Sequence, residues 1–148
     1  MSDKNISETK LPMPMLLCIG AINTHLIKLG LRGYVSINVQ TGDALDTHSF
    51  ATLIGVGATT VNPYLAFDSL FQRYSKKLFG KFSFDECVSR YIKSVNFGLL
   101  KIMSKMGISV LSSYRGGCNF ETVGLSRTIV KDYFPVSYTH LRAHETWS

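Results

Sequence analysis

The most constraining feature of this sequence is a long amphipathic pattern that follows Ser83. Glu86 lies three residues after Ser83, which is the spacing of a helix-capping box. Apolar residues then recur every three or four positions until Gly107, a residue type that commonly ends helices. This apolar face consists of Val88, Tyr91, Ile92, Val95, Leu99, Ile102, Met103 and Met106. The chain must therefore bury one side of a long helix against other elements.

Short β-branched segments separate the other predicted helices. Residues 34–41 alternate apolar and polar side chains with the period of a strand, and residues 59–61 and 108–111 are two further short apolar segments. These segments give three predicted strands. Helices are predicted between Pro14 and Gly30, over residues 46–56 and 64–78, and, as two short pieces, over residues 119–125 and 126–134; residues 112–117 are predicted to form a polar loop.

The alternation of helices and short strands indicates an α/β fold built from parallel βα units, whose strands are usually buried on both faces. Three strands are too few for a closed eight-stranded barrel or a typical doubly wound sheet. We therefore predict an incomplete parallel βα layer, a partial barrel-like arrangement with flanking helices. The 148 residues correspond to about one domain, and 45% hydrophobic against 18% charged residues exclude intrinsic disorder of the whole chain.

The net charge of +6 raises the question of a nucleic-acid partner. The cations are scattered, however, and the one local concentration is Arg73, Lys76, Lys77 and Lys81. We interpret this run as a solvated surface and expect no nucleic-acid partner.

The cysteines and the N-terminal residues indicate the compartment. Cys18, Cys87 and Cys118 form no CxxC pair, which argues against a disulfide framework or a zinc site and favours a reducing compartment. Residues 1–10 are polar and lack the apolar core of a signal peptide, and the longest apolar run, residues 13–22, is short for a membrane span. We expect a cytoplasmic protein with no membrane partner.

Two glycine pairs suggest phosphate binding but match no phosphate-binding motif. Gly55 and Gly57 are better explained by a helix that ends at Gly57. Gly116 and Gly117 are interpreted as a structural turn. The alternative is an anion contact at Arg115, because this residue follows a predicted strand and precedes a predicted helix N-terminus.

The remaining candidate side chains have structural explanations. His25 and His48 have no partner at metal-binding spacing, and Asp46 beside His48 favours a local capping or hydrogen-bonding role. Cys18 is predicted in the core and Cys87 next to it, while Cys118 has the loop context of a reactive thiol. Met103 and Met106 are predicted to pack rather than to bind a cofactor.

Four segments resemble the large subunit of glutamate synthase. They read LPMPMLLCIGAINTHLIKLGLR (residues 11–32), SFATLIGVGATTVNPYLAF (49–67), GLLKIMSKMGIS (98–109) and SYRGGCNFETVGLS (113–126). They occur in the family's order and at its spacing, and the resemblance covers residues 2–134. It implies that residues 1–135 are the C-terminal half of the family's central α/β domain, between the glutamine amidotransferase domain and the FMN-binding barrel.

The resemblance also implies an activity for the parent enzyme. That oxidoreductase of ammonia assimilation and glutamate biosynthesis transfers the amide nitrogen of glutamine to 2-oxoglutarate and yields two glutamates, using FMN and a 3Fe-4S cluster. The family's catalytic cysteine has no counterpart, because Met1 is followed by Ser2, and the three cysteines do not match the cluster motif. We therefore expect no catalytic, cofactor-binding or metal-binding residue in this segment.

The expected role is a structural connector that is inactive alone. Its partners would be the amidotransferase and FMN domains of the same subunit, and the parent enzyme would take electrons through a small subunit or from ferredoxin. The alternative, from a different class, is a free-standing α/β module that binds an anionic ligand near Arg115.

Residues 136–148 depart from the family. They resemble one reading frame of a sequencing adapter, so we interpret them as a non-native tail. A site built from His140 and His144 would then have no biological meaning.

Overall fold

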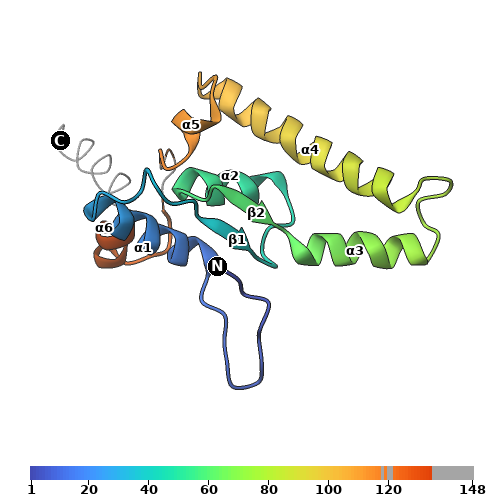
Figure 1. Ribbon diagram of the computed structural model, residues 1–148, viewed down its shortest axis with the longest axis horizontal. Coiled ribbons are helices and arrows are strands. Elements are labelled where there is room, and N and C mark those ends of the chain that lie inside the picture. The colour runs from blue at the N-terminus through green and yellow to red at the C-terminus, as the bar shows by residue number, and fades with distance from the viewer. Residues whose placement is uncertain (118, 120–121, 135–148) are drawn as a thin grey trace.

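The computed structural model describes residues 1–117, 119 and 122–134. This part of the chain forms six helices and two strands, and Figure 1 shows their arrangement. In chain order the elements are α1 (Met15–Lys28), β1 (Asn38–Gln40), α2 (Thr47–Val56), β2 (Thr60–Asn62), α3 (Tyr64–Ser75), α4 (Phe84–Lys105), α5 (Leu111–Tyr114) and α6 (Arg127–Tyr133). The α/β class is confirmed, with helices predominating.

The two strands form a parallel pair connected through α2. Val39 is opposite Val61 in the register. On the other side of β1, the N-terminal residues run alongside it: Ser2 bridges to Gln40, and the amide of Gln40 donates to the carbonyl of Met1 at 2.9 Å. The predicted strand over residues 34–41 is shortened at its start, because the carbonyl of Val35 accepts a hydrogen bond from a side chain at 2.7 Å instead of joining the sheet.

Only one face of this sheet is apolar. Ile37 and Val39 are buried in the core. On the opposite face Asn38 and Thr60 are exposed, and the hydroxyl of Thr60 donates to Oδ1 of Asn38 at 2.8 Å. The expectation that both faces are buried is therefore wrong for the described residues, since a strand that alternates polar and apolar side chains covers one face only.

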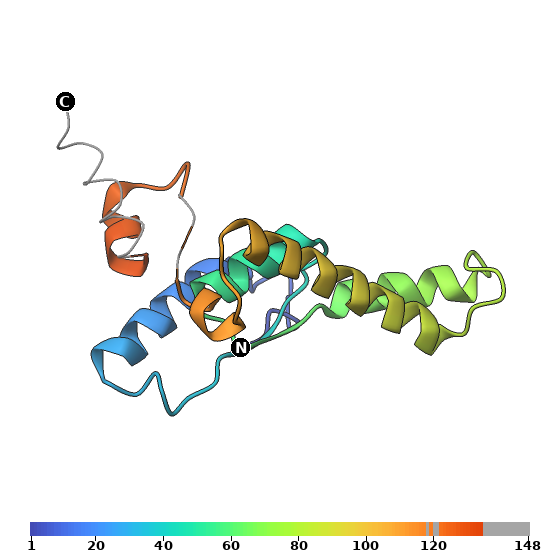
Figure 2. The ribbon, with the colours of Figure 1, turned by 90° about the horizontal axis from the view of Figure 1, so that it is seen from above.

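The core lies between the sheet and helices α1, α2, α4 and α6. Helix α2 is its centre, with six of its ten residues buried. Helix α6 packs beside α1, as Figure 2 also shows, and places the nearly inaccessible ring of Phe134 over Gly20. A Cβ on Gly20 would lie 2.9 Å from that ring, so this approach requires glycine.

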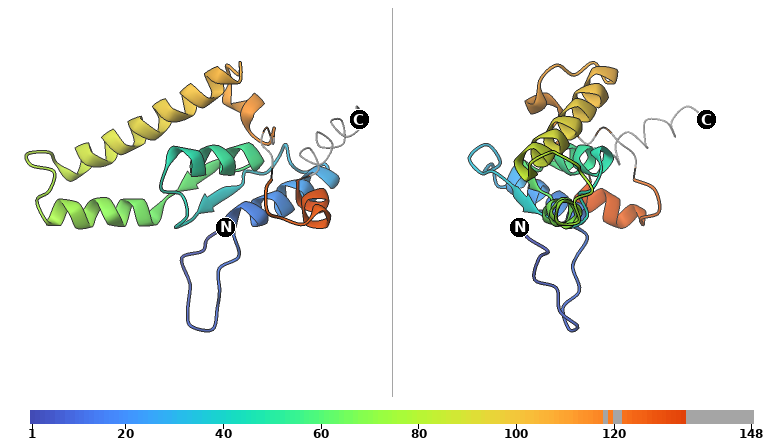
Figure 3. Two further views of the ribbon diagram at one scale, coloured as in Figure 1. Left: turned by 180° about the vertical axis from the view of Figure 1, so that it is seen from behind. Right: turned by 90° about the vertical axis from the view of Figure 1, so that its right-hand side faces the viewer.

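Helices α3 and α4 form an antiparallel pair that extends away from the sheet, with their connecting loop at the far end (Figures 1 and 3). Aromatic side chains hold the two helices together: the ring centroids of Phe67 and Tyr91 are 6.0 Å apart, and those of Phe71 and Phe84 are 5.7 Å apart, both edge to face. Helix α3 ends at Ser75, earlier than the predicted residue 78, because the backbone turns at Lys77 with a φ of 57°.

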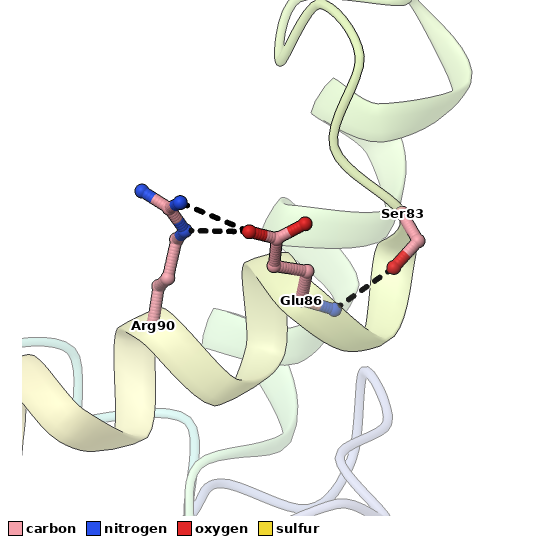
Figure 4. Close-up of polar contacts among 3 residues, drawn as sticks. All are labelled: Ser83, Glu86 and Arg90. Carbon is pink, nitrogen blue, oxygen red and sulfur yellow. Dashed lines mark hydrogen bonds and ion pairs between the residues drawn. The ribbon is translucent and has the colours of Figure 1, made fainter.

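The predicted cap of α4 forms in part (Figure 4). Oγ of Ser83 accepts a hydrogen bond from the amide of Glu86 at 3.2 Å. The side chain of Glu86 does not return to Ser83, because it pairs with Arg90 at 2.9 Å. One half of the capping box is therefore present.

The third predicted strand, over residues 108–111, is wrong. Gly107 adopts a φ of 70°, and the amide of Ile108 bonds back to the carbonyl of Met103 at 2.9 Å. Helix α4 returns the chain to α2, where Ile108 packs against the cluster that includes Ala51 and Ile54. The segment therefore packs on a helix, pairs with neither described strand, and leads into α5. The barrel-like three-stranded layer is thus not confirmed; the described sheet has two strands.

Two further predictions in this region are also corrected. Residues 112–117 are not simply a polar loop, since α5 begins at Leu111 and Tyr114 is buried. No helix forms at residue 119 or residues 122–125. Gly124 has a φ of 88°, which a right-handed helix does not accommodate.

Candidate functional site

The side chain of Arg32, in the loop between α1 and β1, makes three hydrogen bonds to distinct segments of the chain. Its Nε donates to Oδ1 of Asn23 at 2.6 Å, and its two terminal nitrogens donate to the carbonyls of Val35 and Gly57, each at 2.7 Å. We call these four residues the Arg32 junction. The planar guanidinium suits this role because it presents donors in several fixed directions.

The Arg32 junction ties three segments together. Asn23 is buried on α1, Val35 leads into β1, and Gly57 ends α2 with a φ of 138°. A Cβ on Gly57 would lie 2.6 Å from Oδ1 of Asn23, so the close approach of the two helices requires glycine here. The prediction that α2 ends at Gly57 is confirmed.

Sequence reasoning missed Arg32. The signal that could have found it is weak: a single arginine within the apolar and glycine-rich segment LGLRGYV. Its three partners are up to 25 positions away along the chain, and no motif spacing connects them.

The electrostatics of the Arg32 junction involve Arg115. Burial lowers the pKa of Arg32, and the nearby positive charge of Arg115 lowers it further. Arg115 is half-buried directly after α5. The structure therefore brings two guanidinium groups close enough for their charges to interact, although residues 32 and 115 are far apart in sequence.

The position of Arg115 is set by Tyr114 and Gly116. The buried hydroxyl of Tyr114 donates to the carbonyl of Ala51 at 3.0 Å, and burial raises the pKa of this phenol. The amide of Gly116 donates to the carbonyl of Ile54 at 3.2 Å. Both contacts are to α2. The strand predicted before Arg115 is absent, and the next described helix, α6, begins only at Arg127. Arg115 therefore does not lie between a strand and a helix N-terminus, and the prediction of an anion site with that geometry is wrong.

A second polar cluster lies at the end of β1. The carboxylate of Asp3 accepts from the hydroxyl of the inaccessible Thr41 at 2.6 Å and from the amide of Gly42 at 3.2 Å. This contact fixes the N-terminal residues against β1, and its groups are engaged in holding the chain.

The histidine candidates lie on the surface. His25 is exposed in the last turn of α1, and His48 is exposed in the first turn of α2. The cap of α2 is made by Asp46, whose Oδ1 accepts from the amide and the hydroxyl of Ser49 at 2.8 and 2.7 Å. These hydrogen bonds lower the pKa of Asp46, and the nearby His48 contributes less.

The prediction that the methionines pack is confirmed for Met103 and wrong for Met106. Cys87 is buried, Cys18 is half-buried against the core, and Met103 is buried beside Tyr114, whereas Met106 is exposed. Cys118, His140 and His144 lie outside the described residues. Within the described ranges, no group of three or more histidine, cysteine or acidic side chains is arranged to hold a metal ion. None of the helices described is both long and apolar enough to cross a membrane.

Comparison with known proteins identifies the origin of this arrangement. Residues 1–126 match the family described as the glutamate synthase central domain. The chain belongs to this family. The resemblance found in the four sequence segments is thereby confirmed.

Relatives of this glutamate synthase segment come from bacteria and photosynthetic eukaryotes. The chain is 49% identical over 141 residues to the glutamate synthase [NADPH] large chain of Azospirillum brasilense. The matched region covers 95% of this chain and 9% of that protein. It is 47% identical over 134 residues to the corresponding large chain of Bacillus subtilis, with 90% and 9% covered. It is 41% identical over 152 residues to the chloroplastic ferredoxin-dependent glutamate synthase of Spinacia oleracea, with 95% and 9% covered. The chain thus spans about 9% of the length of these relatives.

Proposed function

We propose that this chain is a structural connector within a glutamate synthase and performs no chemistry by itself. In the parent oxidoreductase, the amide nitrogen of glutamine is transferred to 2-oxoglutarate to give two glutamates. This segment would hold the amidotransferase and FMN domains of the same subunit in the relative placement that ammonia transfer needs.

The observation that carries this proposal is the use of Arg32. Of the five N–H donors of its guanidinium, one on Nε and one on each terminal nitrogen donate to the chain itself, so the side chain is used to join segments. Asp3 and Tyr114 are likewise engaged with the backbone or with neighbouring side chains. These three polar side chains therefore join segments of the chain.

Large apolar side chains on the outside support the same role. On α4, Phe97 is 73% exposed and Leu100 is 62% exposed, although an isolated soluble domain rarely gathers such side chains on one helix without a partner. The proposal assigns them to contacts with the rest of the subunit.

The described residues do not fit the cofactors of the parent enzyme. A 3Fe-4S cluster needs several cysteine thiolates around one point, but Cys18 and Cys87 belong to separate helices; Cys18 packs against the apolar core and Cys87 is buried. A flavin phosphate needs backbone donors, but the amide of Gly116 already donates to Ile54. We assign FMN and the cluster to other parts of the subunit, and the electron donor, a small subunit or ferredoxin, to a site outside this segment. Free thiols at Cys18 and Cys87 agree with the proposed cytoplasmic location.

The test uses the complete enzyme with Arg32→Ala. We expect glutamine hydrolysis to continue while the yield of glutamate per glutamine hydrolysed falls, because loosening the Arg32 junction displaces the domains. Arg32→Lys keeps the charge but loses the planar arrangement of donors. Its yield of glutamate per glutamine hydrolysed should lie between those of Arg32→Ala and the natural enzyme. An unchanged yield of glutamate per glutamine hydrolysed, which we call coupling, in a correctly folded Arg32→Ala enzyme would contradict the connector role. Glutamine turnover or stoichiometric flavin binding by the isolated segment would contradict it as well.

The second candidate is a free-standing α/β module that binds an anionic ligand near Arg115. Arg115 favours it because this cation is half-buried directly after α5 and its charge lowers the pKa of Arg32, so a bound anion would offset positive charge there. Inorganic phosphate should then raise the melting temperature of the segment, and Arg115→Ala should abolish the rise. A melting temperature that is independent of phosphate would reject the anion-binding module and retain the connector role.

We also propose that residues 136–148 are not native. The family match ends at residue 126, and the basis for the proposal is the resemblance of the tail to adapter sequence. The Azospirillum alignment covers 95% of the chain and so includes part of this segment. The source nucleotides decide the boundary: independent reads that continue as native coding sequence past codon 136 would overturn the proposal.

A further inference from the structure

The free side of β2 is an open edge with a specific direction. In β2, the amide of Thr60 donates to the carbonyl of Ile37, and the carbonyl of Asn62 accepts from the amide of Thr41. In a parallel ladder, the backbone groups of alternate residues point to opposite sides. The amide and carbonyl of Val61 therefore point away from β1, and among the described residues no strand pairs with β2 on that side.

This edge carries little protection. Natural sheet edges that face solvent are usually guarded by charges, prolines or bulges. The three residues of β2, Thr60–Asn62, carry no charge, and the one proline, Pro63, comes only after the last of them. A two-stranded pair is also marginally stable without further strands or covering layers. Both features are expected of an edge that is covered in the complete protein.

An apolar crevice lies beside this edge, between α2, α3 and α4. Its walls include Phe50, Ile54, Val61, Phe67, Ile92 and Leu99, and its volume is about 270 Å³. Ligand pockets usually have volumes of about 300–1,000 Å³, so this crevice suits an apolar side chain better than a small molecule. Asn96 is exposed and also lines the crevice, where its amide can bond to a neighbouring backbone.

From this geometry we infer that an extended segment of the same enzyme polypeptide, outside the present chain, pairs with Val61 and inserts an apolar side chain into the crevice. The relatives are about ten times longer than this chain, so the complete subunit contains ample polypeptide to supply the segment. A second copy is a poorer partner, because it would offer only the same three-residue strand. The inference rests on the proposed connector role and specifies one of its contacts.

The test uses the complete enzyme with the photo-crosslinking residue p-benzoylphenylalanine in place of Ile92, which lines the crevice and is 44% exposed. Illumination and mass spectrometry should identify a linked peptide from the same polypeptide outside this segment. The matched control places the same residue at Lys101, which is exposed on α4 and does not line the crevice; it should not link to that peptide. Links only within the segment, to a second copy or to a bound small molecule would overturn the inference.

Hydrogen exchange provides a second readout without substitution. In the complete enzyme, the amide of Val61 should exchange at least about 100-fold more slowly than in an unstructured peptide of the same sequence, because it donates to the added segment. Exchange near the unstructured rate would contradict the pairing. These results are independent of the Arg32→Ala test. Altered coupling with no link at Ile92 would retain the connector role and reject this contact. A link at Ile92 with unaltered coupling would retain the contact and reject the connector role.

Discussion

A terminal nitrogen of Arg32 donates a 2.7 Å hydrogen bond to the carbonyl of Gly57, the residue at which α2 ends. The last carbonyls of a helix have no partner within the helix, and Arg32 supplies one from a loop 25 positions earlier. The same guanidinium also bonds to Asn23 on α1. The relative placement of α1 and α2 therefore depends on the side chain of Arg32 and on Gly57, to which it bonds.

Replacing Gly57 by alanine should destabilise the segment by about 1–3 kcal/mol. The backbone at this position has a positive φ, which alanine disfavours, and the added Cβ would collide with Asn23. Denaturant unfolding measures the loss. The matched control is Gly30→Ala: Gly30 also has a positive φ of 68°, but a Cβ there meets nothing within 4 Å. Equal losses in the two variants would show that backbone strain alone matters and that the approach of Asn23 does not.

Replacing Gly98 by alanine should also destabilise the segment, although alanine is the better helix former. A Cβ on Gly98 would lie 2.6 Å from Cγ2 of Thr47, so α4 could no longer approach the start of α2. The loss should be about 1–3 kcal/mol in denaturant unfolding. Adding Thr47→Ala should recover most of it, and a double variant no more stable than Gly98→Ala alone would mean that this contact is not the cause.

Removing the cap of α2 with Asp46→Ala should cost about 1 kcal/mol at neutral pH, whereas Asp46→Asn should cost much less because asparagine also caps helices. Hydrogen bonds from Ser49 lower the pKa of Asp46 below its ordinary value of 3.8. Its ionised form therefore stabilises the fold above pH 3.8, and this contribution is lost as the pH falls through the lower folded pKa.

Unfolding midpoints measured from neutral to strongly acidic pH check the contribution of Asp46. The natural chain should lose its advantage over Asp46→Asn as Asp46 becomes protonated. An advantage that is constant down to the lowest pH would contradict the assignment of the cap.

Tyr114→Phe should cost about 0.5–1.5 kcal/mol through loss of the hydrogen bond to Ala51. Burial raises the folded pKa of Tyr114 above its ordinary value of 10.0. The stabilisation from its neutral form is therefore complete below pH 10 and is lost as the pH rises through the folded pKa. Stability measured at alkaline pH should decline less steeply for Tyr114→Phe than for the natural chain, and parallel declines would show that Tyr114 is not buried.

Local patterns predicted the helices better than the strands. The periodic apolar face after Ser83 and the glycine at position 107 located α4 closely, since helix hydrogen bonds are made within the segment itself. Residues 108–111 have the composition of a strand, but a strand exists only where a second strand is available to pair with it. Here Ile108 packs against residues of α2 instead, and the described sheet contains only β1 and β2. The cap of Asp46 and the end of α2 at Gly57 were likewise predictable from residues close in sequence.

The family, the helical segments and their caps can be read from the amino-acid order, because they depend on long matching segments or on residues within a few positions. Three features emerge only in the folded chain: Arg32 joins α1 to α2, Tyr114 and Arg115 lie near α2 and Arg32, and β2 has one open edge. The first two are contacts between residues about ten to eighty positions apart, and the third follows from which strands pair. No local preference encodes them, since they form only when the packing of the apolar faces has brought the segments together.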